Sequence, residues 1–113
     1  MRILCVDDDR LVLSITADLI RSMGHDVIEA PCARDAAEAI RSTAPIDLLI
    51  TDIGMPDGCG GFELAAFART QRPGVRVIYF SGMAQITPDA GEAMLLRKPC
   101  TLRELRQAIS NVG

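Results

Sequence analysis

Acidic, hydroxyl and amine side chains directly follow four short apolar segments of this sequence. Carboxylates that lie close together repel one another, and a hard divalent cation with oxygen ligands, such as Mg²⁺, relieves that repulsion. A carboxylate held beside such an ion and an ammonium group is well placed to attack phosphorus, because both cations stabilise the charge on the phosphoryl oxygens. These residue types therefore predict phosphoryl transfer to a carboxylate. In chain order the residues are Asp7, Asp8 and Asp9, then Asp52, then Ser81, and then Lys98.

These side chains can meet only if the segments that precede them are strands of one sheet. Short β-rich segments alternate with helix-like segments along the chain, and this alternation predicts parallel strands joined by right-handed crossovers. The carboxyl ends of parallel strands lie at one edge of a sheet, so the acids, Ser81 and Lys98 would converge there. Strands are expected at residues 3–6, 26–29, 47–51, 75–80 and 94–97. Helices are expected at residues 10–23, 33–43, 62–70 and 101–112.

The fold class predicted from this order is α/β, a flavodoxin-like, doubly wound, five-stranded parallel sheet of order 2-1-3-4-5. The strands expected at 47–51 and 75–80 are almost continuously apolar, as is typical of strands covered on both faces. The stretch between the strand expected at 75–80 and the last strand contains Pro88 and Gly91, which disfavour a helix interior. A shortened or irregular fourth helix is therefore expected there.

The helix expected at 10–23 carries a regular apolar pattern. Leu11, Ile15, Leu19 and Met23 recur at spacings of four, which predicts a single apolar stripe. Asp9 precedes this helix and is expected to cap its N-terminus, where a carboxylate is favourable.

Size and composition indicate one domain, spanning residues 1–113. Hydrophobic residues make up 49% of the chain and charged residues 24%, which is typical of a globular domain rather than a disordered chain. The net charge of −3 does not favour a nucleic-acid-binding surface. No apolar run is long enough to span a membrane, and the first residues lack the pattern of a signal peptide. Neither nucleic acid nor a membrane is expected as a partner.

The cysteines do not form a recognisable metal or disulfide pattern. Cys5, Cys32, Cys59 and Cys100 contain no C-x-x-C pair, and His25 is the only histidine in the sequence, so zinc is not expected. A chain with enough apolar residues to build a core also has little need of disulfides. Reduced thiols in a cytoplasmic protein are therefore expected.

Four segments resemble motifs of response-regulator receiver domains. Residues 3–9 (ILCVDDD) are similar to the first strand and acidic pair of that family, and residues 48–56 (LLITDIGMP) to its phosphoacceptor strand and following loop. Residues 79–82 (YFSG) and 96–99 (LRKP) are similar to its switch hydroxyl and lysine-proline motifs. The glycine-rich segment at 55–64 resembles the form found in receivers of hybrid histidine kinases. The resemblance covers essentially the whole chain.

The resemblance implies a role for each acid at the expected sheet edge. Asp52 would be the phosphoacceptor. Mg²⁺ would be bound directly by Asp8, by Asp52 and by the backbone carbonyl of Gly54, and Asp7 would contribute through water. No organic cofactor is implied.

The resemblance also implies how the phosphoryl group would be received and sensed. Lys98 would contact it, and Ser81 would hydrogen-bond it and report its presence. Leu95 stands where many relatives carry a switch aromatic. The donor would be a histidine kinase or a histidine phosphotransfer protein, and the phosphorylated form would bind its partners differently. Such a domain is not a conventional enzyme, although it would promote its own phosphorylation and dephosphorylation.

Three alternatives share parts of this pattern. A phosphatase of the haloacid dehalogenase class would use Asp7 and Asp9 as paired aspartates, but Leu11 stands where threonine or valine is expected. A pseudo-receiver would bind partners without phosphorylation, which the complete set of acids, hydroxyl and lysine disfavours. A flavin carrier of the same fold would need a hydroxyl-rich phosphate loop after the first strand. No basic recognition helix is present, so direct transcriptional control by this chain is not expected.

Overall fold

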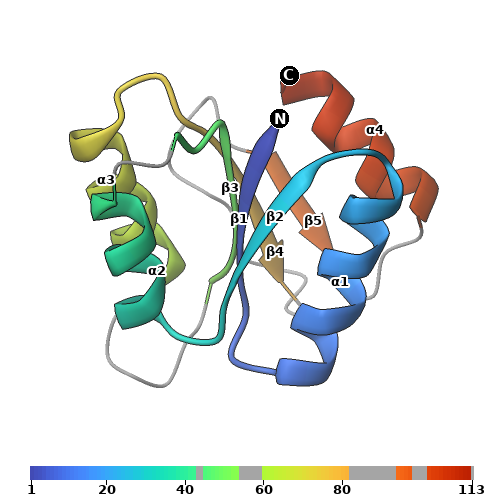
Figure 1. Ribbon diagram of the computed structural model, residues 1–113, viewed down its shortest axis with the longest axis horizontal. Helices are drawn as coiled ribbons and strands as arrows, with labels where there is room; N and C mark the ends of the chain where they lie inside the picture. The colour runs from blue at the N-terminus through green and yellow to red at the C-terminus, as the bar shows by residue number, and fades with distance from the viewer. Residues whose placement is uncertain (43–44, 54–59, 82–93, 98–101, 113) are drawn as a thin grey trace.

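Five parallel strands form the centre of the molecule in the computed structural model, which describes residues 1–42, 45–53, 60–81, 94–97 and 102–112 (Figure 1). The strands are β1 (Arg2–Val6), β2 (Asp26–Ala30), β3 (Leu48–Asp52), β4 (Arg76–Ser81) and β5 (Met94–Arg97). Their order across the sheet is β2-β1-β3-β4-β5, and every neighbouring pair is parallel. This arrangement confirms the predicted doubly wound α/β fold, and each strand boundary lies within one residue of the predicted one.

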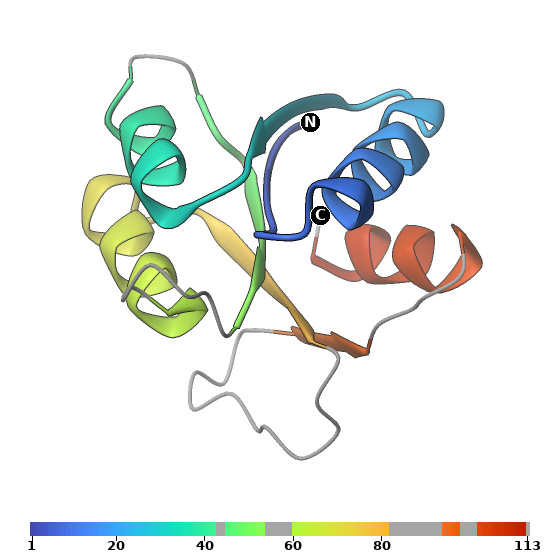
Figure 2. The ribbon, with the colours of Figure 1, turned by 90° about the horizontal axis from the view of Figure 1, so that it is seen from below.

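Helices cover both faces of the sheet. In the described ranges they are α1 (Arg10–Ser22), α2 (Ala33–Arg41), α3 (Gly61–Gln71) and α4 (Leu102–Val112). Figure 2 shows α1 and α4 on one face and α2 and α3 on the other. Residues 82–93, where a short or irregular fourth helix is expected, lie outside the described ranges. None of the described helices is both long and apolar enough to cross a membrane.

Successive side chains along the strands pack into two separate hydrophobic clusters, one on each face of the sheet. Leu49 and Val77 belong to the cluster beneath α2 and α3, whereas the next residues, Ile50 and Ile78, belong to the cluster beneath α1 and α4. The helices complete the first cluster with Ala36, Ile40, Leu64 and Ala65, and the second with Leu13, Ile20, Leu105 and Ile109. Because both faces are covered, the polar groups of the central strands β1 and β3 meet solvent at the strand ends.

The apolar stripe predicted along α1 is wrong for its first half. The side chains of Leu11 and Ile15 are 70% and 52% exposed, whereas Leu19 and Met23 are partly buried against the cluster beneath α1 and α4. Four residues turn a helix by about 40° more than a full turn, so a spacing of four winds around the helix instead of following one face. The face that packs on the sheet consists of Leu13, Thr16, Ala17 and Ile20.

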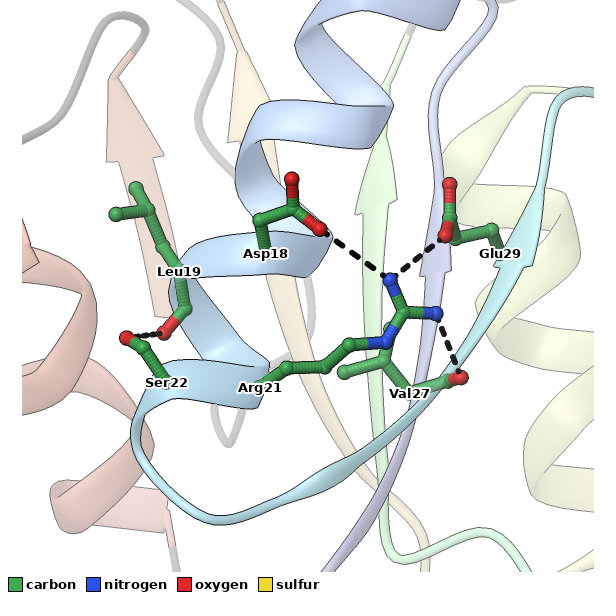
Figure 3. Close-up of polar contacts among 6 residues, drawn as sticks. All are labelled: Asp18, Leu19, Arg21, Ser22, Val27 and Glu29. Atoms are coloured by element: carbon green, nitrogen blue, oxygen red, sulfur yellow. Dashed lines mark hydrogen bonds and ion pairs between the residues drawn. The ribbon is translucent and has the colours of Figure 1, made fainter.

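Arg21, near the end of α1, joins this helix to β2 (Figure 3). Its Nη1 atom lies 2.9 Å from a carboxylate oxygen of Glu29 and 3.5 Å from one of Asp18. Its Nη2 atom donates a hydrogen bond of 3.3 Å to the backbone carbonyl of Val27. Since β2 is an edge strand with β1 as its sheet neighbour, the guanidinium adds a second attachment for this strand.

Replacing Arg21 with alanine should lower the free energy of unfolding by about 1 kcal/mol, because exposed ion pairs contribute about 0.2–1 kcal/mol and a hydrogen bond is also lost. Urea unfolding measures this change, which should shrink at high salt because exposed charges are screened. Arg34→Ala on α2 is the control, since no ion pair of Arg34 is seen within the described residues. An equal loss of unfolding free energy in Arg21→Ala and Arg34→Ala would show that the contacts of Arg21 with β2 do not stabilise the domain.

The two ends of the chain lie near each other in both ribbon views (Figure 1, Figure 2). The N-terminus lies where β1 begins, and the last turn of α4 lies at the same end of the molecule. All five strands run away from this end. Their carboxyl ends therefore form the opposite edge of the sheet.

Candidate functional site

Three carboxylates gather at the carboxyl ends of β1 and β3, which are neighbours at the centre of the sheet. One carboxylate oxygen from each of Asp7, Asp8 and Asp52 lies within 4.8 Å of the other two. Asp7 is buried, Asp52 is half-buried and Asp8 is exposed. The group thus extends from the protein interior to the surface.

Strand pairing explains why these acids meet. Val6 is in register with Thr51, so the residues that follow them, Asp7 and Asp52, leave the sheet side by side. The Asp7 backbone N–H donates to the carbonyl of Ala30 on the other neighbouring strand, at 3.2 Å. Asp7 is therefore fixed between β2 and β3.

Asp9 connects this group of acids to the start of α1. Its backbone N–H donates to a carboxylate oxygen of Asp7 at 3.0 Å. Its own Oδ1 accepts hydrogen bonds from the backbone N–H groups of Leu11 and Val12 at 3.0 and 3.2 Å, and this is the predicted N-terminal cap. The turn that presents Asp7 and Asp8 is thus tied to a regular helix.

The backbone around Asp52 is held by local hydrogen bonds. The Oδ1 atom of Asp52 accepts the backbone N–H of Ile53 at 2.9 Å. The hydroxyl of Thr51, which is completely buried, donates to the backbone carbonyl of Asp52 at 2.9 Å. These bonds restrict both the carboxylate and the peptide group that carries it.

Helix α3 begins directly against the end of β3. The backbone N–H of Gly61 donates to the carbonyl of Ile53 at 2.7 Å, and a Cβ atom placed on Gly61 would lie only 2.2 Å from the carbonyl oxygen of Asp52. The next residue, Phe62, packs edge-on against Tyr79 of β4, with ring centroids 4.7 Å apart. Sequence reasoning missed this junction, although the paired glycines before the helix were a signal of a close backbone approach.

The comparisons with known proteins assign this arrangement to a family. A family model described as response regulator receiver domain matches residues 3–110. The chain belongs to this family. It is thus a receiver domain of two-component signalling.

Two relatives and one solved structure illustrate the likeness. The sensor histidine kinase AruS of Pseudomonas aeruginosa is 33% identical over an alignment that covers 100% of this chain and 12% of AruS. The response regulator receiver protein CpdR of Brucella abortus is 30% identical, with 98% of this chain and 95% of CpdR covered. The crystal structure of the receiver domain from the hybrid histidine kinase CckA matches with a TM-score of 0.86 at 32% identity, covering 99% of this chain and 98% of that one. This receiver domain therefore spans a small part of AruS but nearly all of CpdR.

The other candidate residues of the receiver domain are placed less completely. Ser81 is the last residue of β4, whose Phe80 is in register with Asp52, so its backbone lies at the same edge as the acids. Strand β5 ends at Arg97, in register with Ser81. Lys98, which follows in the sequence, lies outside the described residues, as does Gly54.

Carboxylate oxygens at this spacing suit a hard divalent cation. Such cations take oxygen ligands, and Mg²⁺ in particular is held by one or two carboxylates while keeping several waters. An exposed Asp8 leaves room for those waters, and the half-buried Asp52 is open to a reactant. The donor set of this receiver domain therefore fits Mg²⁺.

Proposed function

We propose that this receiver domain accepts a phosphoryl group on Asp52 with Mg²⁺ as its cofactor. The observation that carries the proposal is the meeting of three carboxylates, with Asp52 half-buried beside Asp7 and Asp8. In the reaction, a carboxylate oxygen of Asp52 would attack phosphorus, and the bond from phosphorus to the donor's imidazole nitrogen would break. The electron pair of that bond would stay on the donor nitrogen, and the imidazole would leave as a neutral ring with its proton on the other ring nitrogen.

Each remaining residue of the site has a distinct part in this proposal. Asp8, Asp52 and the backbone carbonyl of Gly54 would bind Mg²⁺ directly, and Asp7 would hold it through water. When bound, Mg²⁺ would offset negative charge on the carboxylates and the phosphoryl oxygens. Lys98 would contact the phosphoryl oxygens with its ammonium group, and Ser81 would donate a hydrogen bond to them.

The proposed phosphoryl donor is a histidine kinase or a histidine phosphotransfer protein. Three large hydrophobic side chains are exposed close to the acids in sequence and in the fold: Leu11 and Ile15 on α1, and Phe62 at the start of α3. Leu11 lies in the helical turn that Asp9 caps. Neighbouring exposed apolar side chains are typical of protein–protein contact sites. We infer that a donor docks on Leu11 and Ile15 and so brings its phosphohistidine to Asp52.

The double variant Leu11→Ala, Ile15→Ala should slow phosphoryl transfer from a histidine phosphotransfer domain by about tenfold or more, because a few side chains carry most of the binding free energy of such contacts. Its labelling by acetyl phosphate should be unchanged, since that donor needs no docking surface. Both rates can be followed by radiolabel transfer. The control is Glu38→Ala, an exposed residue on α2. If the rates of phosphorylation by the two donors fell equally, Leu11 and Ile15 would be affecting the site itself and not the docking of the protein donor.

Incubation with acetyl phosphate and Mg²⁺ tests the function as a whole. A receiver domain gains one acid-stable, base-labile phosphoryl group, which intact-mass measurement detects. A phosphatase would release phosphate without accumulating this phosphoryl group, and a pseudo-receiver would neither gain the group nor release phosphate, so either result would overturn the proposal. The proposed setting is the cytoplasm, where the thiols of Cys5 and Cys32, neither of which forms a disulfide, would stay reduced.

A further inference from the structure

We propose that Gly61 is a positioning residue for phosphorylation, because the lack of a side chain there sets the position of the Asp52 peptide. The inference rests on the proposed function of Asp52. Gly61 is buried, and its own N–H is bonded to the carbonyl of Ile53. The first turn of α3 thus contacts both peptide groups that follow the Asp52 side chain.

The space at Gly61 is too small for any side chain. A Cβ atom would lie 2.2 Å from the Asp52 carbonyl oxygen, 3.0 Å from its carbonyl carbon and 2.9 Å from the Cα of Ile53. These neighbours are backbone atoms, so the contact cannot be relieved by turning a flexible side chain. Ordinary contact would require a relative shift of about 1 Å between α3 and the end of β3.

Helix α3 is not free to move away from β3. Phe62 packs against the buried ring of Tyr79, and Leu64 and Ala65 are 1% and 0% exposed in the cluster beneath α2 and α3. Retreat of the helix would break these contacts and the bond from Gly61 to Ile53. Strain from a Cβ at Gly61 would therefore fall on the last residue of β3, Asp52, which is paired with Phe80 of β4 and lies at the carboxyl edge of the sheet.

A shift of the Asp52 peptide would change the site directly. The displaced carbonyl is the acceptor for the Thr51 hydroxyl, and the next N–H in the chain, that of Ile53, is bonded to the Asp52 carboxylate. Moving the peptide therefore moves the carboxylate relative to Asp7 and Asp8. A displacement of about 1 Å in a reacting group costs on the order of a hundredfold in rate.

Gly61→Ala should therefore be phosphorylated by acetyl phosphate at least about tenfold more slowly than the wild type and should bind Mg²⁺ more weakly. Gly74→Ala is the matched control, because a Cβ there meets nothing within 4 Å. Gly60→Ala, whose Cβ would lie 3.3 Å from the Ile53 carbonyl oxygen, should show a smaller loss of the same kind. Intact-mass measurement gives the phosphorylation rate, and Mg²⁺ titration followed by NMR gives the affinity for the ion.

A further control must separate a loss of fold stability from a shift of the Asp52 peptide. Ile40→Ala creates a cavity at the end of α2 farther from the site, and it should lose stability while keeping its labelling rate and Mg²⁺ affinity. The inference is overturned if folded Gly61→Ala matches Gly74→Ala in both measurements. If Gly61→Ala fails to fold, the labelling rate and Mg²⁺ affinity of Gly60→Ala are compared with those of Gly74→Ala instead, and equal values overturn the inference. An unlabelled wild type would instead refute the proposed function, and the Mg²⁺ titrations would then decide the positioning role alone.

Discussion

Asp52→Asn should reduce phosphorylation by acetyl phosphate to background. The amide oxygen of asparagine is a much weaker nucleophile than a carboxylate, and of the three clustered acids only Asp52 lies on β3, between β1 and β4. The substitution keeps the size of the side chain and an oxygen acceptor for the N–H of Ile53, so the fold should persist. Intact-mass measurement should show the added phosphoryl group on the wild type and none on the variant.

Peptide mapping supplies the stricter test of this prediction. In the wild type, the modified peptide should be the one that contains Asp52. Asp26→Asn, at an exposed position on the far end of β2, should be labelled like the wild type. Robust labelling of Asp52→Asn, for example on Asp7 or Asp8, would show that the phosphoacceptor has been assigned to the wrong residue.

Asp8→Ala should weaken Mg²⁺ binding by tenfold or more. Removing a group that only supports a metal ligand costs roughly 10–100-fold in affinity, so removing a direct ligand should cost at least as much. Asp8 is exposed, which makes a large loss of stability unexpected. Titration followed by NMR should give the affinity, with the amides of Asp7, Asp8 and Asp52 shifting first in the wild type.

The control for this prediction is Asp26→Ala, which removes an exposed carboxylate from the opposite edge of the sheet. Its Mg²⁺ affinity should equal that of the wild type. The phosphorylation rate of Asp8→Ala should fall in parallel with its affinity and recover in part at high Mg²⁺. Unchanged affinity in Asp8→Ala would show that the ion is held elsewhere.

The fold was predictable because its main determinants are local. Strands β1 and β3 are apolar runs that meet a polar residue at or directly after their last position, as at Asp7 and Asp52, and the alternation of strands and helices admits few topologies. The convergence of Asp7, Asp8 and Asp52 at one edge then follows from parallel pairing. The roles of these residues, and of Ser81, Lys98 and Gly54, stay predictions.

The packing of α1 was not predictable from large apolar residues alone. Thr16 and Ala17 lie against the sheet, where small side chains allow the helix to approach closely, while Leu11 and Ile15 face solvent. A pattern based on hydrophobicity ranks leucine and isoleucine above threonine and alanine. It cannot recognise an apolar residue kept at the surface, which is where we place the contact with the phosphoryl donor.

The tight junction at Gly61 was also beyond sequence reasoning, for a different reason. A glycine in the sequence signals either an unusual backbone angle or a close approach, and only the fold shows which backbone comes near. Here the approaching group is the Asp52 carbonyl, nine residues earlier in the chain. The distance arises from the docking of α3 on β3, which no local pattern encodes.

The shared location of the two chain ends constrains how this domain can be tethered. The five residues of β1 span about 16 Å, so a polypeptide fused at the N-terminus would be anchored roughly that far from Asp7 and Asp52, at the opposite edge of the sheet. A short tether would leave the reacting edge open to a docking partner. A module fused there would be anchored away from Asp52, so a direct route for it to sense the proposed phosphorylation is a change in the shape of the domain between them.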